Sequence, residues 1–167
     1  TLPLSLLRDV EALQGIILEI AKDDYKQAHP NRQRLPRGFS EHLELHLSAR
    51  PGSFVAEVAL IKDDALLSGC DPHMDQARRA CARFVDVLAH VQEQRQGPPP
   101  FLPDAAWAYL ERFGRGLQPE ESIRITGVNA IEVQLTRELR RRLLLSRPGS
   151  RSEEHTSELQ APCNLVC

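Results

Sequence analysis

Histidine and carboxylate residues are the first candidates for chemistry in this chain. His42, Glu44 and His46 alternate, so one face of a β-strand would carry all three. Residues four apart on a strand are separated by roughly 13 Å, whereas zinc holds its ligands within about 2.0–2.2 Å. We therefore interpret the three as the polar outer face of a half-buried strand, and we expect no metal ligand and no cofactor-binding residue.

A second candidate group lies at the start of an amphipathic segment and comprises Cys70, Asp71, His73 and Cys81. Asp71 precedes Pro72 as an N-cap precedes the first helical residue, and Cys81 falls in an apolar stripe where cysteine packs as a small hydrophobe. A Cys70–His73 pair has no third group to orient it. The chain also lacks a nucleophile-elbow motif, a glycine-rich phosphate loop and Cys-x-x-Cys. We predict no catalytic residue and favour a non-enzymatic role.

Two arginine clusters could bind phosphate groups, one in the connection 29–39 and one in a helix expected at 136–145. The residues predicted for nucleic-acid or partner contact are Arg32, Arg34, Arg37, Arg140, Arg141 and Arg142, with Arg137 beside the last three. Nucleic-acid-binding domains usually carry excess positive charge, but this chain has 21 Lys+Arg against 23 Asp+Glu. Nucleic-acid binding is therefore the alternative, and arginines paired on a solvated surface are the simpler interpretation.

The segment from His42 to Ile61 organises the elements around these groups. Apolar residues alternate on both sides of a Pro51-Gly52-Ser53 turn, which predicts a β-hairpin with one apolar face. A lone hairpin is marginal in water, so the amphipathic segments at 6–27 and 72–96 are expected to cover it. Each segment has an apolar stripe, and the two stripes could pack on each other, on the sheet or across a dimer. The first stripe comprises Leu6, Val10, Leu13, Ile17 and Ile20, and the second comprises Met74, Ala77, Cys81, Phe84, Leu88 and Val91.

The C-terminal half repeats this order of elements. Alternating runs at 122–125 and 131–135 predict a second hairpin, between helices that begin at Pro103 and after the candidate cap Thr136. The expected fold is α+β, with two short antiparallel β-hairpins and about four amphipathic helices in the order α-β-β-α, linker, α-β-β-α.

A proline-rich segment indicates a division of the chain. The stiff segment 97–102 is a Pro-rich linker between a helix-hairpin-helix domain at 1–96 and a second helix-hairpin-helix segment at 103–150. We expect the second segment to pack on the first.

The last seventeen residues, 151–167, resemble a DNA-sequencing adapter translated in one frame. Arg151 to Gln160 (RSEEHTSELQ) match it without a gap, and 164–167 resemble its continuation beyond a variable index. The resemblance implies a non-native, disordered tail that is excluded from fold reasoning. Without it, 20 basic and 20 acidic residues and two cysteines remain. Because the chain starts at Thr1 and runs into this segment, we expect a fragment of a longer protein.

The body loosely resembles uncharacterised hypothetical proteins of GC-rich bacteria, through the connection HPNRQRLPRGF (29–39) and the Arg-Pro-Gly-Ser turn that follows (50–53). This resemblance implies a cytoplasmic bacterial protein. The sequence contains no run of eighteen or more apolar residues, so we predict no membrane span. The expected function is protein interaction or regulation, through an unknown protein partner or self-association along one helical stripe. Nucleic-acid binding is the second hypothesis, and an enzyme without a recognisable motif is the third.

Overall fold

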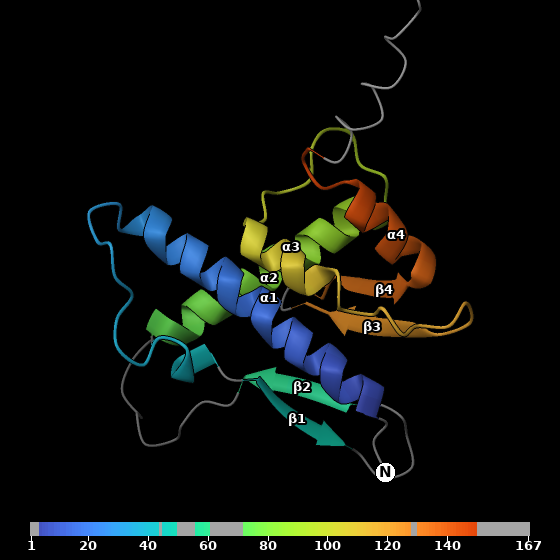
Figure 1. The fold of residues 1–167 in the computed structure, drawn as a ribbon, viewed down its shortest axis with the longest axis horizontal. Helices are drawn as coiled ribbons and strands as arrows, with labels where there is room; N and C mark the ends of the chain where they lie inside the picture. The colour runs from blue at the N-terminus through green and yellow to red at the C-terminus, as the bar shows by residue number, and fades with distance from the viewer. Residues whose placement is uncertain (1–3, 44, 50–55, 61–71, 128–129, 150–167) are drawn as a thin grey trace, which may run out of the picture.

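The computed structural model describes residues 4–43, 45–49, 56–60, 72–127 and 130–149 (Figure 1). Its elements, in chain order, are α1 (Leu4–Ala28), the 3-10 helix η1 (Glu41–Leu43), β1 (Leu45–Ala49), β2 (Ala56–Leu60), α2 (Pro72–Gln92), α3 (Asp104–Leu110), β3 (Ser122–Thr126), β4 (Glu132–Thr136) and α4 (Arg137–Leu145). The predicted α+β class is confirmed.

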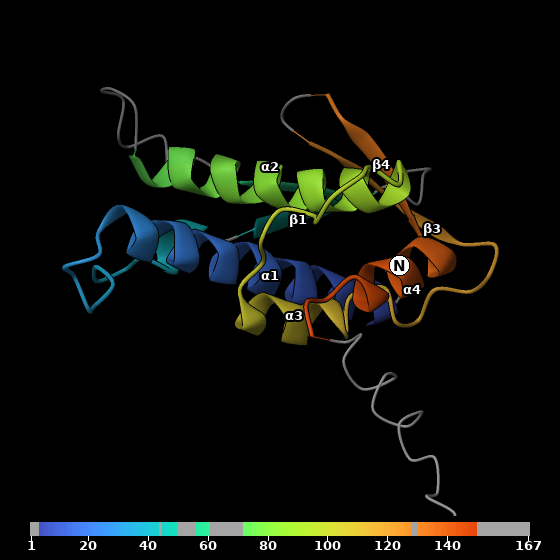
Figure 2. The same cartoon turned by 90° about the horizontal axis from the view of Figure 1, so that it is seen from above.

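The long helices α1 and α2 cross as two layers in contact (Figures 1 and 2). Their apolar stripes meet there, because Ile17 and Ile20 of α1 and Phe84 and Leu88 of α2 are at most 2% exposed. Every stripe residue whose side chain the structure describes is buried or half-buried. The two stripes therefore cover each other within one chain, and self-association along a stripe stays a prediction.

The limits of both helices differ slightly from those predicted. The described part of the first helix spans Leu4–Ala28, against an expected segment of 6–27. The second ends at Gln92 and not near 96, because the chain turns at Gln94, whose φ of 51° is left-handed. The predicted start of the fourth helix is confirmed, since Thr136 Oγ1 accepts a hydrogen bond from Leu139 N at 3.1 Å.

The strands form two antiparallel pairs, β1 with β2 and β3 with β4. Leu47 lies opposite Val58 in the first pair, and Arg124 lies opposite Gln134 in the second. The connections at 50–55 and 128–129 lie outside the described residues. The structure therefore describes the two strand pairs, whereas the turns that would complete the two predicted hairpins lie outside the described residues.

The predicted first strand was wrong at its beginning. His42 lies in η1, which precedes β1, because Leu43 turns into the core and is only 2% exposed. His42 is therefore not on the strand that carries His46, and Glu44 lies outside the described residues. The prediction that a single strand carries all three polar residues is therefore wrong at His42.

One core joins elements on both sides of the Pro-rich segment 97–102. The third helix packs along α1, while β4 and α4 pack on α2. The joined core includes Ile16 of α1, Leu110 of α3 and Leu139 of α4. The division into two helix-hairpin-helix units stays a prediction. Among the described helices, none combines the length and apolar character needed to cross a membrane.

Candidate functional site

The cysteine and histidine candidates do not build a site in the described part of the chain. Cys70 and Asp71 lie outside the described residues, and Cys81 is half-buried in α2. Burial raises the pKa of the Cys81 thiol to about 11, so the thiol is protonated at neutral pH and is a poor nucleophile. Within the ranges that the structure describes, no three His, Cys, Asp or Glu side chains are grouped to hold a metal ion.

The first arginine cluster follows the C-terminal end of α1. Arg32 donates from Nη1 to the Tyr25 hydroxyl at 3.2 Å, and the Tyr25 ring stacks on His29 with 4.3 Å between ring centroids. All three arginines of this loop are exposed, and Arg34 and Arg37 form no ion pair with a described carboxylate.

The second cluster, on α4, is mostly engaged within the fold. Arg140 Nε donates to the Phe113 carbonyl at 2.8 Å, and its Nη2 donates to the Glu111 carbonyl. These carbonyls follow the end of α3, where helical carbonyls lack partners, so Arg140 stabilises that end. Arg141 forms a two-bond pair with Glu138 at 3.1 and 3.2 Å.

The third member of this cluster turns inward. Arg142 is half-buried, and its Nε is a buried donor with no acceptor among the described residues. Arg137, at the start of α4, is an exposed arginine whose charge is not paired with a described carboxylate.

The two arginine clusters lie at opposite ends of α1 in both views (Figures 1 and 2). The helix has 25 residues and is roughly 37 Å long. The connection 29–39 follows its C-terminus, whereas the α4 region is tied near its N-terminus, where Gly114 N donates to Asp9 Oδ1 at 2.9 Å. The described structure does not bring the two clusters together.

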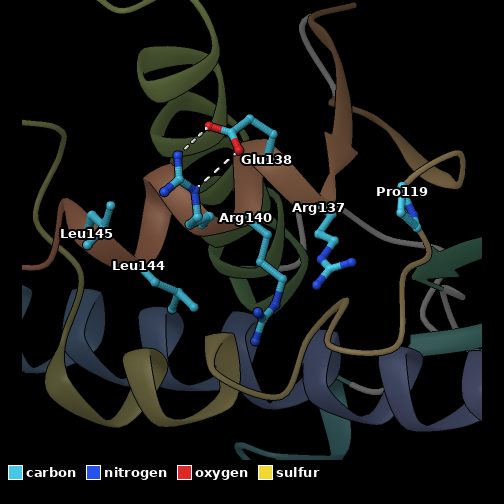
Figure 3. A pocket seen from close by; sticks show the side chains of 7 residues that line it. Pro119, Arg137, Glu138, Arg140, Leu144 and Leu145 are labelled. Atoms are coloured by element: carbon cyan, nitrogen blue, oxygen red, sulfur yellow. Dashed lines mark hydrogen bonds and ion pairs between the residues drawn. The ribbon is translucent and has the colours of Figure 1, made fainter.

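A hollow of about 570 Å³ opens along the exposed face of α4, and we call it the α4 groove. It is lined by Pro119, Arg137, Glu138, Arg140, Arg141, Leu144 and Leu145. Figure 3 shows Arg137 and Arg140 extending from the same side of α4 towards α1, while Glu138 points the opposite way. The groove therefore combines a cationic end with an apolar end.

The charges of the groove persist at neutral pH. Its single carboxylate, Glu138, has a lowered pKa because Arg141 donates hydrogen bonds to the ionised form. Burial lowers the pKa of Arg140, and nearby Arg115 lowers it further, while Asp9 and Glu111 oppose the shift. An arginine remains protonated despite such a shift. Three arginines and one carboxylate leave the groove with a net positive charge.

The apolar end was not predicted from the sequence. Leu145 is 59% exposed, and Leu144 is half-buried at the same end. The signal was the run Leu143-Leu144-Leu145, because three consecutive residues on an α-helix cannot all face one side. With Leu143 only 1% exposed in the core, the next two leucines must diverge from it.

Comparison with known proteins assigns the chain to no family. The chain matches no protein-family model, no curated protein and no solved structure. The functional argument therefore depends on the groove itself.

Proposed function

We propose that this domain is a non-enzymatic protein-interaction module that binds an acidic segment of a partner protein in the α4 groove. The observation that carries the proposal is that exposed Leu145 and exposed Arg137 line the same groove at opposite ends of one short helix. A partner segment with carboxylates followed by an apolar side chain complements both ends. Such segments are a recurring form of recognition by arginine clusters and apolar grooves.

The charge arrangement selects an acidic partner. Arg137 has no described ion-pair partner to displace, and Arg141 is held by Glu138 on an exposed surface where ion pairs are weak. A carboxylate arriving at the groove can pair with Arg137 directly. Opposite charge also speeds encounter and rejects basic partners.

The leucine end favours a protein partner over a nucleic acid. Phosphate contacts are made by cations, polar side chains and backbone N–H groups, and they need no leucine. Covering a Leu side chain contributes about 1.5–3 kcal/mol when its burial is complete. Nucleic-acid binding remains the alternative through the arginines alone, and it would need a footprint that spans the separation of the two clusters along α1.

The test is fluorescence anisotropy with a short labelled peptide in which glutamates precede leucines at helical spacing. We expect Arg137→Glu to weaken binding at least about tenfold, because it replaces attraction by repulsion. Leu145→Ser should also weaken it. Arg34→Glu is the matched control, since it makes the same charge change at the other end of α1, and its affinity should equal that of the wild type.

A labelled DNA duplex and a single-stranded RNA are the competing probes in the same assay. Binding of either nucleic acid that is weakened by both Arg137→Glu and Arg34→Glu, but not by Leu145→Ser, would establish the alternative and overturn the proposal. Equal peptide affinity for the wild type and Arg137→Glu would overturn it as well.

A further inference from the structure

The segment between α2 and α3 is an exposed, proline-rich ridge, and its prolines favour the polyproline II conformation. Three prolines, 98–100, follow Gly97, and Pro103 precedes α3 with φ −65° and ψ 151°, the angles of polyproline II. Proline fixes its own φ near −65° and drives the residue before it into the extended region. Gly97, with φ of 90°, supplies the left-handed turn by which the chain enters this segment.

Two pairs of residues that lie three apart in the segment share their burial, which agrees with the three-residue turn of polyproline II. Pro99 is half-buried and Leu102 is 3% exposed, so these two face the body. Pro98 and Phe101, also three apart, face solvent, and Phe101 is 61% exposed. The outward side of the ridge therefore carries the Pro98 ring and the aromatic ring of Phe101.

Both ends of the ridge are fixed to α2. His90 Nε2 lies 3.0 Å from the Gly97 carbonyl oxygen, and Arg83 Nε donates to the Phe101 carbonyl at 2.8 Å. Arg83 also pairs with Asp23 and Asp24 of α1, so the anchor reaches both long helices. The ridge is thus held in one conformation before any partner arrives.

The carbonyls between these anchors are available. Among the described residues, those of 98–100 accept no hydrogen bond, although Pro98 and Pro100 are exposed. Proline-recognising domains use a groove lined by aromatic side chains, and Tyr and Trp there can donate to carbonyl oxygens. A preformed ligand also loses less conformational entropy on binding.

We propose that the ridge 97–101 is a second docking site, independent of the α4 groove, and that its partner is a domain with an aromatic-lined, proline-recognising groove. Proline 98 and Phe101 occupy the groove, and the carbonyls of 98–100 accept hydrogen bonds from its aromatic rim. The stiffness of the segment serves recognition as well as connection.

The experiment titrates the intact chain into a panel of purified SH3, WW and EVH1 domains and follows the tryptophan fluorescence or amide NMR shifts of each domain. We expect at least one domain to bind saturably. The double variant Pro98→Ala/Phe101→Ala should lose at least about tenfold in affinity, which is a difference the titration resolves. Pro30→Ala, which removes an exposed proline elsewhere, and Arg137→Glu, which alters the α4 groove, should bind as the wild type does.

Two results would overturn the inference. One is the absence of saturable binding across the whole panel, and the other is binding that the double variant retains. A thermal melt of the double variant verifies folding. If that variant unfolds, Phe101→Ser alone replaces it, because this exposed side chain contributes little to the core, and retained affinity in that variant would equally refute the site.

Discussion

The contact between α1 and α3 is closely packed, whereas the outer face of α4 exposes a large apolar side chain to solvent. At Gly15 the helices are so close that an added Cβ would lie 2.4 Å from Tyr109 Cδ1. On α4, Leu145 is 59% exposed beside cationic neighbours. Packing explains the glycine at position 15, whereas most of Leu145 is left uncovered by the described residues. The residues that packing leaves unexplained are the ones to examine for binding.

The sharpest test of this contrast compares two leucines of α4. Leu143→Ala removes a side chain that is 1% exposed and should lower the free energy of unfolding by about 2–5 kcal/mol. Leu145→Ala should change it by no more than about 0.5 kcal/mol, as surface substitutions do. Urea unfolding measures both. Similar losses for the two variants would show that the outer face of α4 is structural and would remove the basis for the α4 groove as a binding site.

The α1–α3 contact gives the second prediction, of intermediate size. Gly15→Ala should cost about 1–3 kcal/mol through overpacking against Tyr109, although alanine in a helix interior is otherwise favoured by about 1 kcal/mol. Thermal or urea unfolding of the variant measures the loss. Gly116→Ala is the matched control, because an added Cβ there meets nothing within 4 Å.

A double-variant cycle identifies the cause of that loss. With Tyr109→Ala in the background, Gly15→Ala should become neutral or stabilising, because the ring that blocks the new methyl group is gone. An undiminished cost in that background would mean that the helices are not in close contact at position 15.

The sequence predicted elements whose local pattern and packing agree. Thr136 caps α4 as expected, and the α1 and α2 stripes are covered as amphipathic faces must be. The prediction failed at His42, where a tertiary contact of Leu43 selects a 3-10 turn although alternation favours a strand. Local periodicity cannot contain that long-range contact.

The candidate site was only partly predictable, for a similar reason. Arginine at 140 and 141 was visible in the sequence, but its engagement with α3 carbonyls and with Glu138 depends on how the helices pack. The groove is positioned by that same packing. The sequence pattern therefore predicted the charged residues but not the exposed leucines beside them, which favour a protein partner.

The smallest predicted effect concerns Asp9, which joins the two compared regions by accepting a hydrogen bond from Gly114 N close to Arg140. Burial raises the pKa of this carboxyl above its ordinary value of 3.8, although the Gly114 hydrogen bond and Arg140 oppose the shift. A raised folded-state pKa means that the folded protein binds the proton more tightly than the unfolded chain does. The resulting stabilisation is complete below the unfolded pKa and is lost as pH rises through the folded pKa.

Asp9→Asn separates this titration from the hydrogen bond, because the amide oxygen can still accept from Gly114 N. The free energy of unfolding of the wild type, measured relative to the variant by urea titration at several pH values, should therefore fall as pH rises from below 3.8 to neutrality. A rise over the same interval would show that Arg140 outweighs burial at Asp9. The electrostatic attraction between Asp9 and Arg140 would then stabilise the contact between α1 and α4. Arg140 would be committed to structure, which leaves Arg137 as the cation on which recognition in the α4 groove depends.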